Sequence, residues 1–255
     1  MKTIPSAAVV ASPATVQLWR RMAALPELTI DDALVRFLDA QRSRLAPRTF
    51  RRYEEICDLL RHCLNGYGHT GLSGLELKRW ERAYEAGDEE AFCHLMGPEQ
   101  LVDNLGEFLG YFMIRKVAAG QEVLRAAGTV TKSLAKWLHQ QGWIDDEALA
   151  VAVDRGGDAA RDLPKADELA SLLYELTQRS PRVDDPNAVA DDDWVEDRLQ
   201  IERVEPGALW FEGGVGPLKV PKQVTELAQE GWSVTVVLAR VQGAWHLLEV
   251  GNVYP

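Results

Sequence analysis

The spacing of the apolar residues changes near Arg198, and this change constrains the fold more than any other feature of the chain. Before it, apolar residues recur every three or four positions, as in amphipathic helices; after it, they alternate with polar residues, as in half-buried strands. Between the two patterns, residues 180–197 carry seven acidic side chains, two prolines and one base, Arg182. Such a composition repels itself and cannot collapse into a core. We therefore predict an α+β protein of two domains, with a helical bundle over 14–180, an acidic linker over 181–197 and a small β-barrel over 198–255.

The barrel is predicted to contain three strands, a helix and two further strands. The expected strands cover 199–201, 208–212, 216–220, 232–241 and 244–250, and the expected helix covers 221–229. This order is that of a five-stranded OB-fold, and an SH3-like barrel is the alternative. Four tryptophans lie in or just before the segment: Trp194, Trp210, Trp232 and Trp245. In so small a barrel we interpret them as core residues in preference to stacking platforms for nucleic acid.

The segment before the linker is predicted to be helical throughout. The expected helices cover 14–25, 33–38, 47–65, 75–85, 89–96, 99–118, 122–140, 146–153 and 165–178. Thr29 or Asp31 can cap the second of these helices, because either side-chain oxygen can accept from free backbone N–H groups at a helix start.

The helix predicted over 47–65 combines a clear apolar face with the densest positive charge in the chain. Its apolar residues fall within one arc of about 140° when successive residues are turned by about 100°. They are Phe50, Tyr53, Ile56, Cys57, Leu60, Cys63 and Leu64. The stretch from Arg42 to Arg52 contains five arginines and no acidic residue: Arg42, Arg44, Arg48, Arg51 and Arg52. It is therefore a candidate contact surface for an anionic partner.

The net charge of −11 is unevenly distributed along the chain. Residues 1–150 carry 18 basic and 20 acidic side chains, whereas residues 151–255 carry 10 basic and 19 acidic ones. An anionic partner is therefore expected to meet the N-terminal half. Three cysteines and the absence of an apolar run of about 20 residues favour a cytoplasmic protein without membrane contact.

Several sequence patterns match chemical sites but have simpler structural explanations. Residues 66–71 match G-x-G-x-x-G, but they follow a predicted helix where a dinucleotide site needs a strand, so we interpret them as a helix end. The acidic run at 180–197 lacks the ligand spacing of a calcium loop, and a solvated linker is favoured. A zinc site could be drawn from His62, Cys63, His69, Cys93 and His94. Its spacing fits no standard site, so core packing is favoured for the cysteines.

Two motifs resemble the SAM-like, core-binding domain of tyrosine recombinases, the phage integrase family. The first is Ala46-Pro-Arg-Thr49-Phe-Arg-Arg-Tyr53, which is similar to the opening S-x-x-T-x-x-x-Y of that domain. The second is Thr129 to Ile144, which is similar to the last helix of the domain. The resemblance covers about Thr29 to Ile144 and implies a helical bundle that clamps duplex DNA. It implies phosphate and groove contacts at Arg48, Arg51, Arg52, Lys132 and Lys136.

The catalytic half of a recombinase has no counterpart, because no histidine in the chain is followed three residues later by arginine. The signatures of serine hydrolases, zinc proteases and P-loop hydrolases are missing too. We therefore predict a non-enzymatic protein without cofactor or metal, which binds DNA or assists recombination. The predicted DNA-binding residues are Arg42, Arg44, Arg48, Arg51, Arg52, Lys132 and Lys136. The alternative is a protein-interaction scaffold, in which the arginines are solvated or meet an acidic protein. The barrel is a further candidate site for a protein partner.

Overall fold

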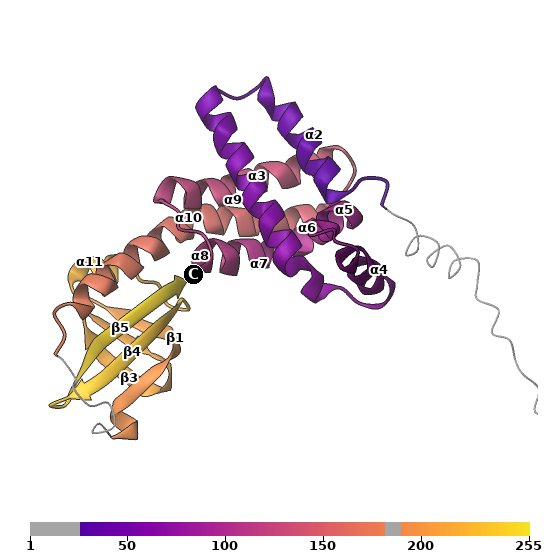
Figure 1. Cartoon of the computed structure of the whole chain (residues 1–255). Coiled ribbons are helices and arrows are strands. Elements are labelled where there is room, and N and C mark those ends of the chain that lie inside the picture. The colour runs from indigo at the N-terminus through magenta and orange to yellow at the C-terminus, as the bar shows by residue number, and fades with distance from the viewer. Residues whose placement is uncertain (1–25, 182–189) are drawn as a thin grey trace, which may run out of the picture.

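The computed structural model describes residues 26–181 and 190–255. It is an α+β structure, in which a helical N-terminal part is followed by a closed five-stranded β-barrel (Figure 1). The helix predicted over 14–25 lies outside the described residues. Among the described residues, no helix combines the length and the apolar character that a membrane span would need.

The first described helices form an antiparallel hairpin on which shorter helices pack (Figure 1). The hairpin consists of α2 (Ile30–Arg42) and α3 (Pro47–Tyr67), and α3 ends in a 3-10 turn (Gly68–Gly71). The hydroxyl of Thr29 accepts a hydrogen bond of 3.2 Å from the backbone N–H of Asp32, which confirms the predicted cap. The helices α4 (Gly74–Glu85) and α5 (Ala91–Leu95) follow, close to their predicted positions.

The single helix predicted over 99–118 is wrong, because this segment is broken into several short pieces. The pieces are α6 (Pro98–Asp103), α7 (Leu105–Glu107), a π-helical turn (Phe108–Phe112) and α8 (Met113–Arg115). At the first break, the Asn104 side chain donates a 2.8 Å hydrogen bond to the carbonyl of Gln100. A side chain that occupies this carbonyl competes with the helical backbone pattern.

The two helices predicted over 146–153 and 165–178 are one continuous helix, α10 (Asp146–Thr177), which runs through Pro164. The proline removes one backbone hydrogen-bond donor. The helix nevertheless carries buried apolar residues both before and after the proline, and these pack on two separate cores. Leu163 belongs to the core of the bundle, whereas Leu169 and Leu173 belong to the core of the barrel. Packing along its whole length therefore outweighs the local signal of the proline.

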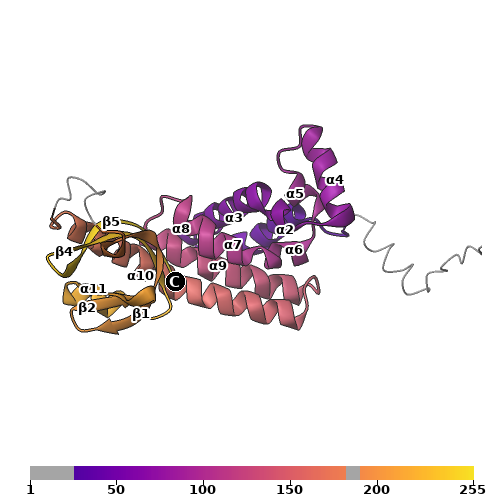
Figure 2. The ribbon, with the colours of Figure 1, turned by 90° about the horizontal axis from the view of Figure 1, so that it is seen from below.

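Helix α9 (Gln121–Gln140) lies side by side with α10 (Figure 2). A Cβ added at Gly156 would lie 2.8 Å from the carbonyl oxygen of Gly128. The backbones of α9 and α10 therefore approach so closely at this point that only glycine fits. This close approach attaches the long helix, and with it the barrel, to the bundle.

The barrel closes in the strand order β1-β2-β3-β5-β4. Its strands are β1 (Trp194–Glu205), β2 (Ala208–Phe211), β3 (Val215–Lys219), β4 (Ser233–Val241) and β5 (Ala244–Tyr254). All neighbours are antiparallel except β3 and β5, which pair in parallel at Leu218 and Trp245. The helix α11 (Lys222–Leu227) lies between the third and fourth strands in sequence, so the predicted order of elements is confirmed.

The predicted linker over 181–197 extends too far, because β1 already begins at Trp194. The residues from Trp194 to Asp197 pair with β4 from Ala239 back to Val236. The acidic side chains Glu196 and Asp197 are exposed, and Arg240 forms an ion pair with Asp193 just before the strand. The charge pattern predicted that these carboxylates would keep the segment unstructured. The segment nevertheless pairs as a strand, because the carboxylates are exposed to solvent.

Candidate nucleic-acid interface

The predicted arginine surface lies at the turn between α2 and α3, at the top of the molecule in Figure 1. Arg42 ends α2, Arg44 lies in the turn, and Arg48, Arg51 and Arg52 lie in the first two turns of α3. The first turn of α3 contains no acidic residue, and Ala46 supplies no side-chain cap. Because the N-terminal end of a helix is itself partly positive, the arginines add to this charge.

The opposite face of α3 is fixed to the rest of the bundle, as its apolar pattern predicts. Ile56, Cys57, Leu60, Cys63 and Leu64 are buried. Tyr53 is half-buried and stacks on Phe37 at 5.8 Å between ring centroids, and its hydroxyl donates a 3.1 Å hydrogen bond to Ser133 of α9. The helix that carries three of the arginines is therefore held by its neighbours on both sides.

A carboxylate from α9 reaches the arginines of α3. Glu122 Oε2 lies 3.2 Å from Arg48 Nη2 and 3.4 Å from Arg52 Nη2, and Arg52 also pairs with Glu55. Glu122 could not be recognised as their partner from the sequence, because it lies 74 positions from Arg48 and 70 from Arg52 and no local pattern links them.

The degree of exposure separates the arginines into two kinds. The side chains of Arg48 and Glu122 are 83% and 67% exposed, and such solvated pairs contribute only about 0–1 kcal/mol. Arg52 is only 29% exposed and has two carboxylate partners, so it is held more firmly. Arg44 and Arg51 are exposed, and no carboxylate of the described residues lies within ion-pair distance of them. Most of the positive charge at this end of the hairpin is therefore accessible to an anion.

Arg42 has a different environment from the other arginines at the hairpin end. Its guanidinium lies 5.4 Å from the centre of the Phe50 ring and 4.0 Å from a carboxylate oxygen of Asp39. The ring and the carboxylate hold this side chain along the hairpin, between α2 and α3. Arg42 therefore contributes charge but is less free to reorient than Arg44 or Arg51.

The two predicted lysines of α9 do not extend the arginine surface. Ser133 faces α3, where it accepts the hydrogen bond from Tyr53. The neighbouring Lys132 is half-buried and faces α10, because a Cβ added at Gly156 would lie 3.2 Å from the Cβ of Lys132. Lys136 follows one turn later and is exposed. Arg125 is exposed and lies three residues after Glu122, hence on the same face of α9. Arg125 therefore lies beside the arginine surface, although no local sequence pattern singles it out.

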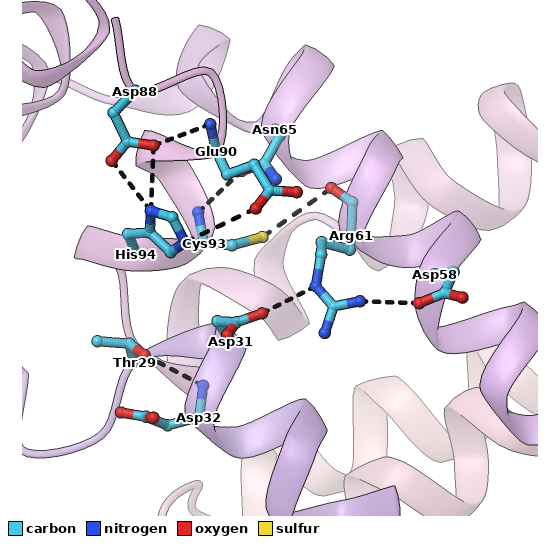
Figure 3. A network of polar contacts seen from close by, with 10 residues as sticks. All are labelled: Thr29, Asp31, Asp32, Asp58, Arg61, Asn65, Asp88, Glu90, Cys93 and His94. Carbon is cyan, nitrogen blue, oxygen red and sulfur yellow. Dashed lines mark hydrogen bonds and ion pairs between the residues drawn. The ribbon is translucent and has the colours of Figure 1, made fainter. Parts of the chain in front are cut away.

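A second charged cluster links α2, α3 and α5 (Figure 3). Arg61 pairs with Asp31 and Asp58, each at 2.8 Å, and its side chain is largely buried. The carbonyl of Arg61 lies 3.9 Å from Cys93 Sγ, and the Asn65 side chain accepts a 3.0 Å hydrogen bond from the Cys93 backbone N–H. These contacts join three helices, so we assign the cluster a structural role.

Of the residues considered as zinc ligands, Cys63 and Cys93 are buried in the core, as is the third cysteine, Cys57. Burial raises the pKa of Cys57, Cys63 and Cys93 to about 12, so these thiols stay protonated. His69 stacks on Trp80 at 4.3 Å, and His94 lies 3.0 Å from Asp88, whose hydrogen bond raises the pKa of the imidazole. Within residues 26–181 and 190–255, no group of three or more such side chains is arranged to hold a metal.

The glycine-rich segment at 66–71 ends a helix, as predicted. Helix α3 continues through Gly66 to Tyr67, slightly beyond its expected end, and the 3-10 turn follows. A Cβ at Gly68 would lie 2.6 Å from the ring of Phe92, so tight packing explains that glycine. The segment therefore has none of the strand-to-helix context of a dinucleotide site.

The tryptophans of the barrel divide between core and surface. Trp232 is buried, and Trp245 packs against the barrel core, in agreement with the core interpretation. Trp210 is half-buried, and the guanidinium of Arg203 lies 3.9 Å from the centre of its ring. The core interpretation therefore holds only in part.

The comparisons with known proteins add no identification. No protein-family model matches the chain, and neither the curated proteins nor the solved structures gave a match.

Proposed function

We propose that this protein is a non-catalytic DNA-binding or recombination-accessory protein, and that it contacts the phosphates of duplex DNA with the end of the α2–α3 hairpin. The observation that supports this function best is the grouping of five arginines at this end, with Arg44 and Arg51 exposed and Arg48 in a weak, solvated ion pair. Guanidinium groups suit phosphate because they form two parallel hydrogen bonds with it.

The distribution of charge should confine DNA binding to the arginines at the hairpin end and make the affinity depend on salt concentration. Each arginine that neutralises a phosphate releases condensed counterions, so affinity falls as the salt concentration rises. With about four phosphate contacts, binding should weaken about a hundredfold between roughly 50 and 200 mM salt. The net charge of −11 should keep the remainder of the molecule away from DNA.

A protein-interaction scaffold is the second candidate, and helix α4 favours it. No residue of α4 is buried, although the helix is amphipathic. Leu75 and Tyr84 are 46% and 52% exposed, and Trp80 stacks on Tyr84 at 5.1 Å. Apolar side chains gathered on a surface helix are typical of a contact site for another protein.

The DNA-binding proposal is tested with the full chain and a fluorescent 20-base-pair duplex at low salt. We expect anisotropy to report binding that is lost when Arg48, Arg51 and Arg52 are changed together to alanine. The matched control changes the exposed residues Lys78, Arg82 and Lys219 to alanine, which removes the same charge elsewhere. Equal loss in both variants, or no binding by the natural sequence, would exclude the hairpin as a DNA contact and leave the scaffold.

A further inference from the structure

A cavity of about 360 Å³ lies where the bundle meets the barrel, and the proposed DNA contact does not use it. Its walls come from α8 and the segment after it, from α10 and from the end of β5, which lie close together in Figure 1. Most of the residues that line it are apolar, for example Met113, Val117, Leu163 and Val253, and their backbone groups, with Asp167 and Asn252, contribute polar surface. Cavities of this size at a junction between structural units are typical sites for small molecules.

Asp167 brings a carboxylate without a positive partner to this cavity. It lines the cavity from α10 at an exposed position, and no basic side chain of the described residues forms an ion pair with it. The hydroxyl of Ser171 donates to its backbone carbonyl and leaves the carboxylate free. Partial burial raises the pKa of Asp167, and the neighbouring charge of Glu168 adds to this effect. A cationic group placed beside Asp167 would favour its ionised form.

Asn252 supplies a second polar group from the barrel side. It lies in β5 between Val250, which pairs with Val236, and Val253, which pairs with Val234. Two residues of β5 thus face the single residue Thr235, which is a β-bulge, and bulges commonly redirect a side chain near a binding site. Asn252 therefore lines the cavity across from α10 and offers both a donor and an acceptor.

We propose that this cavity binds a small organic amine. The ammonium group pairs with the carboxylate of Asp167, the amide of Asn252 provides a further hydrogen bond, and the apolar body of the ligand occupies the space between α8, α10 and β5. An acidic ligand is disfavoured because the carboxylate of Asp167 would repel it. This inference is independent of DNA binding, since none of the arginines of the hairpin lines the cavity.

The test compares 2-phenylethylamine with its neutral analogue 2-phenylethanol, using ¹H–¹⁵N spectra of the full chain at millimolar ligand. The amine should shift the side-chain amide of Asn252 and the backbone amide of Val253, and it should bind about tenfold tighter than the alcohol. Asp167→Asn should remove this preference, whereas Glu168→Gln, which removes the adjacent charge outside the lining, should retain it.

A second variant tests the cavity without touching its charge. Ala170→Leu places extra volume in the lining and should weaken both ligands. The proposal is overturned if the amine causes no shift at Asn252, if both ligands bind equally well, or if Asp167→Asn and Glu168→Gln behave alike.

Discussion

Glu122 is the residue whose substitution most sharply tests the geometry of the arginine surface. Its carboxylate lies 3.2 Å from Arg48 and 3.4 Å from Arg52 and therefore competes with phosphate for both. Glu122→Gln removes this competition and one negative charge while keeping the shape of the side chain. We therefore expect the variant to bind duplex DNA more tightly than the natural sequence.

The magnitude of this effect follows from the exposure of the two ion pairs. A solvated pair is worth about 0.2–1 kcal/mol, so freeing two arginines should give about 1 kcal/mol, which is roughly a fivefold gain in affinity. The gain should shrink at high salt, because exposed charges are screened. The free energy of unfolding should fall by no more than about 1 kcal/mol, since the same two pairs are lost from the folded state.

Fluorescence anisotropy with the 20-base-pair duplex measures the affinity, and urea unfolding measures the stability. Glu175→Gln is the matched control, because it removes the same charge from an exposed position on α10. If Glu122→Gln binds no better than Glu175→Gln, or binds more weakly than the natural sequence, the arginines paired with Glu122 do not contact DNA.

Three further predictions concern the fold. Gly128→Ala should lower the free energy of unfolding, measured by urea titration, by about 1–3 kcal/mol, because the added Cβ would overlap the backbone of Gly156. Gly157→Ala is the control and should be neutral or stabilising, because the space around Gly157 is open. The hydrogen bond with Asp88 raises the pKa of His94, so the stability that this pair contributes should be complete below the pKa of histidine in the unfolded chain and lost as pH rises through the pKa of His94 in the folded protein. Asp88→Asn should abolish this pH dependence, as measured by urea titrations at several pH values. All three cysteines should resist iodoacetamide at pH 8 until the chain is unfolded, because they are buried with pKa values near 12; mass spectrometry of the native protein would contradict this if it showed rapid labelling.

Local patterns were sufficient to predict elements whose environment repeats along the chain. The apolar arc of the helix over 47–65 predicted the buried face of α3, since helical periodicity alone decides which side faces the core. The alternation after Arg198, together with turn residues, predicted the order of strands and helix in the barrel. In both cases the signal and the structure it encodes lie within the same short segment.

Features that depend on distant partners could not be predicted in this way. The proline at position 164 suggested a break, but α10 packs on two cores and continues. Charge suggested a linker up to Asp197, but β4 pairs with this segment. The partner of Arg48 is Glu122, on a different helix, and only the tertiary structure brings the two together. The candidate interface is therefore predictable as a set of arginines, but its competing carboxylate is not.

The salt dependence of duplex binding by the full chain tests the proposed function most directly. For about four arginine–phosphate contacts, the logarithm of the association constant should fall against the logarithm of salt concentration with a slope between about −3 and −4. Changing Arg48, Arg51 and Arg52 to alanine should reduce the steepness of this slope by about 2–3. A slope near zero, or one that the triple substitution leaves unchanged, would contradict phosphate contact by the hairpin.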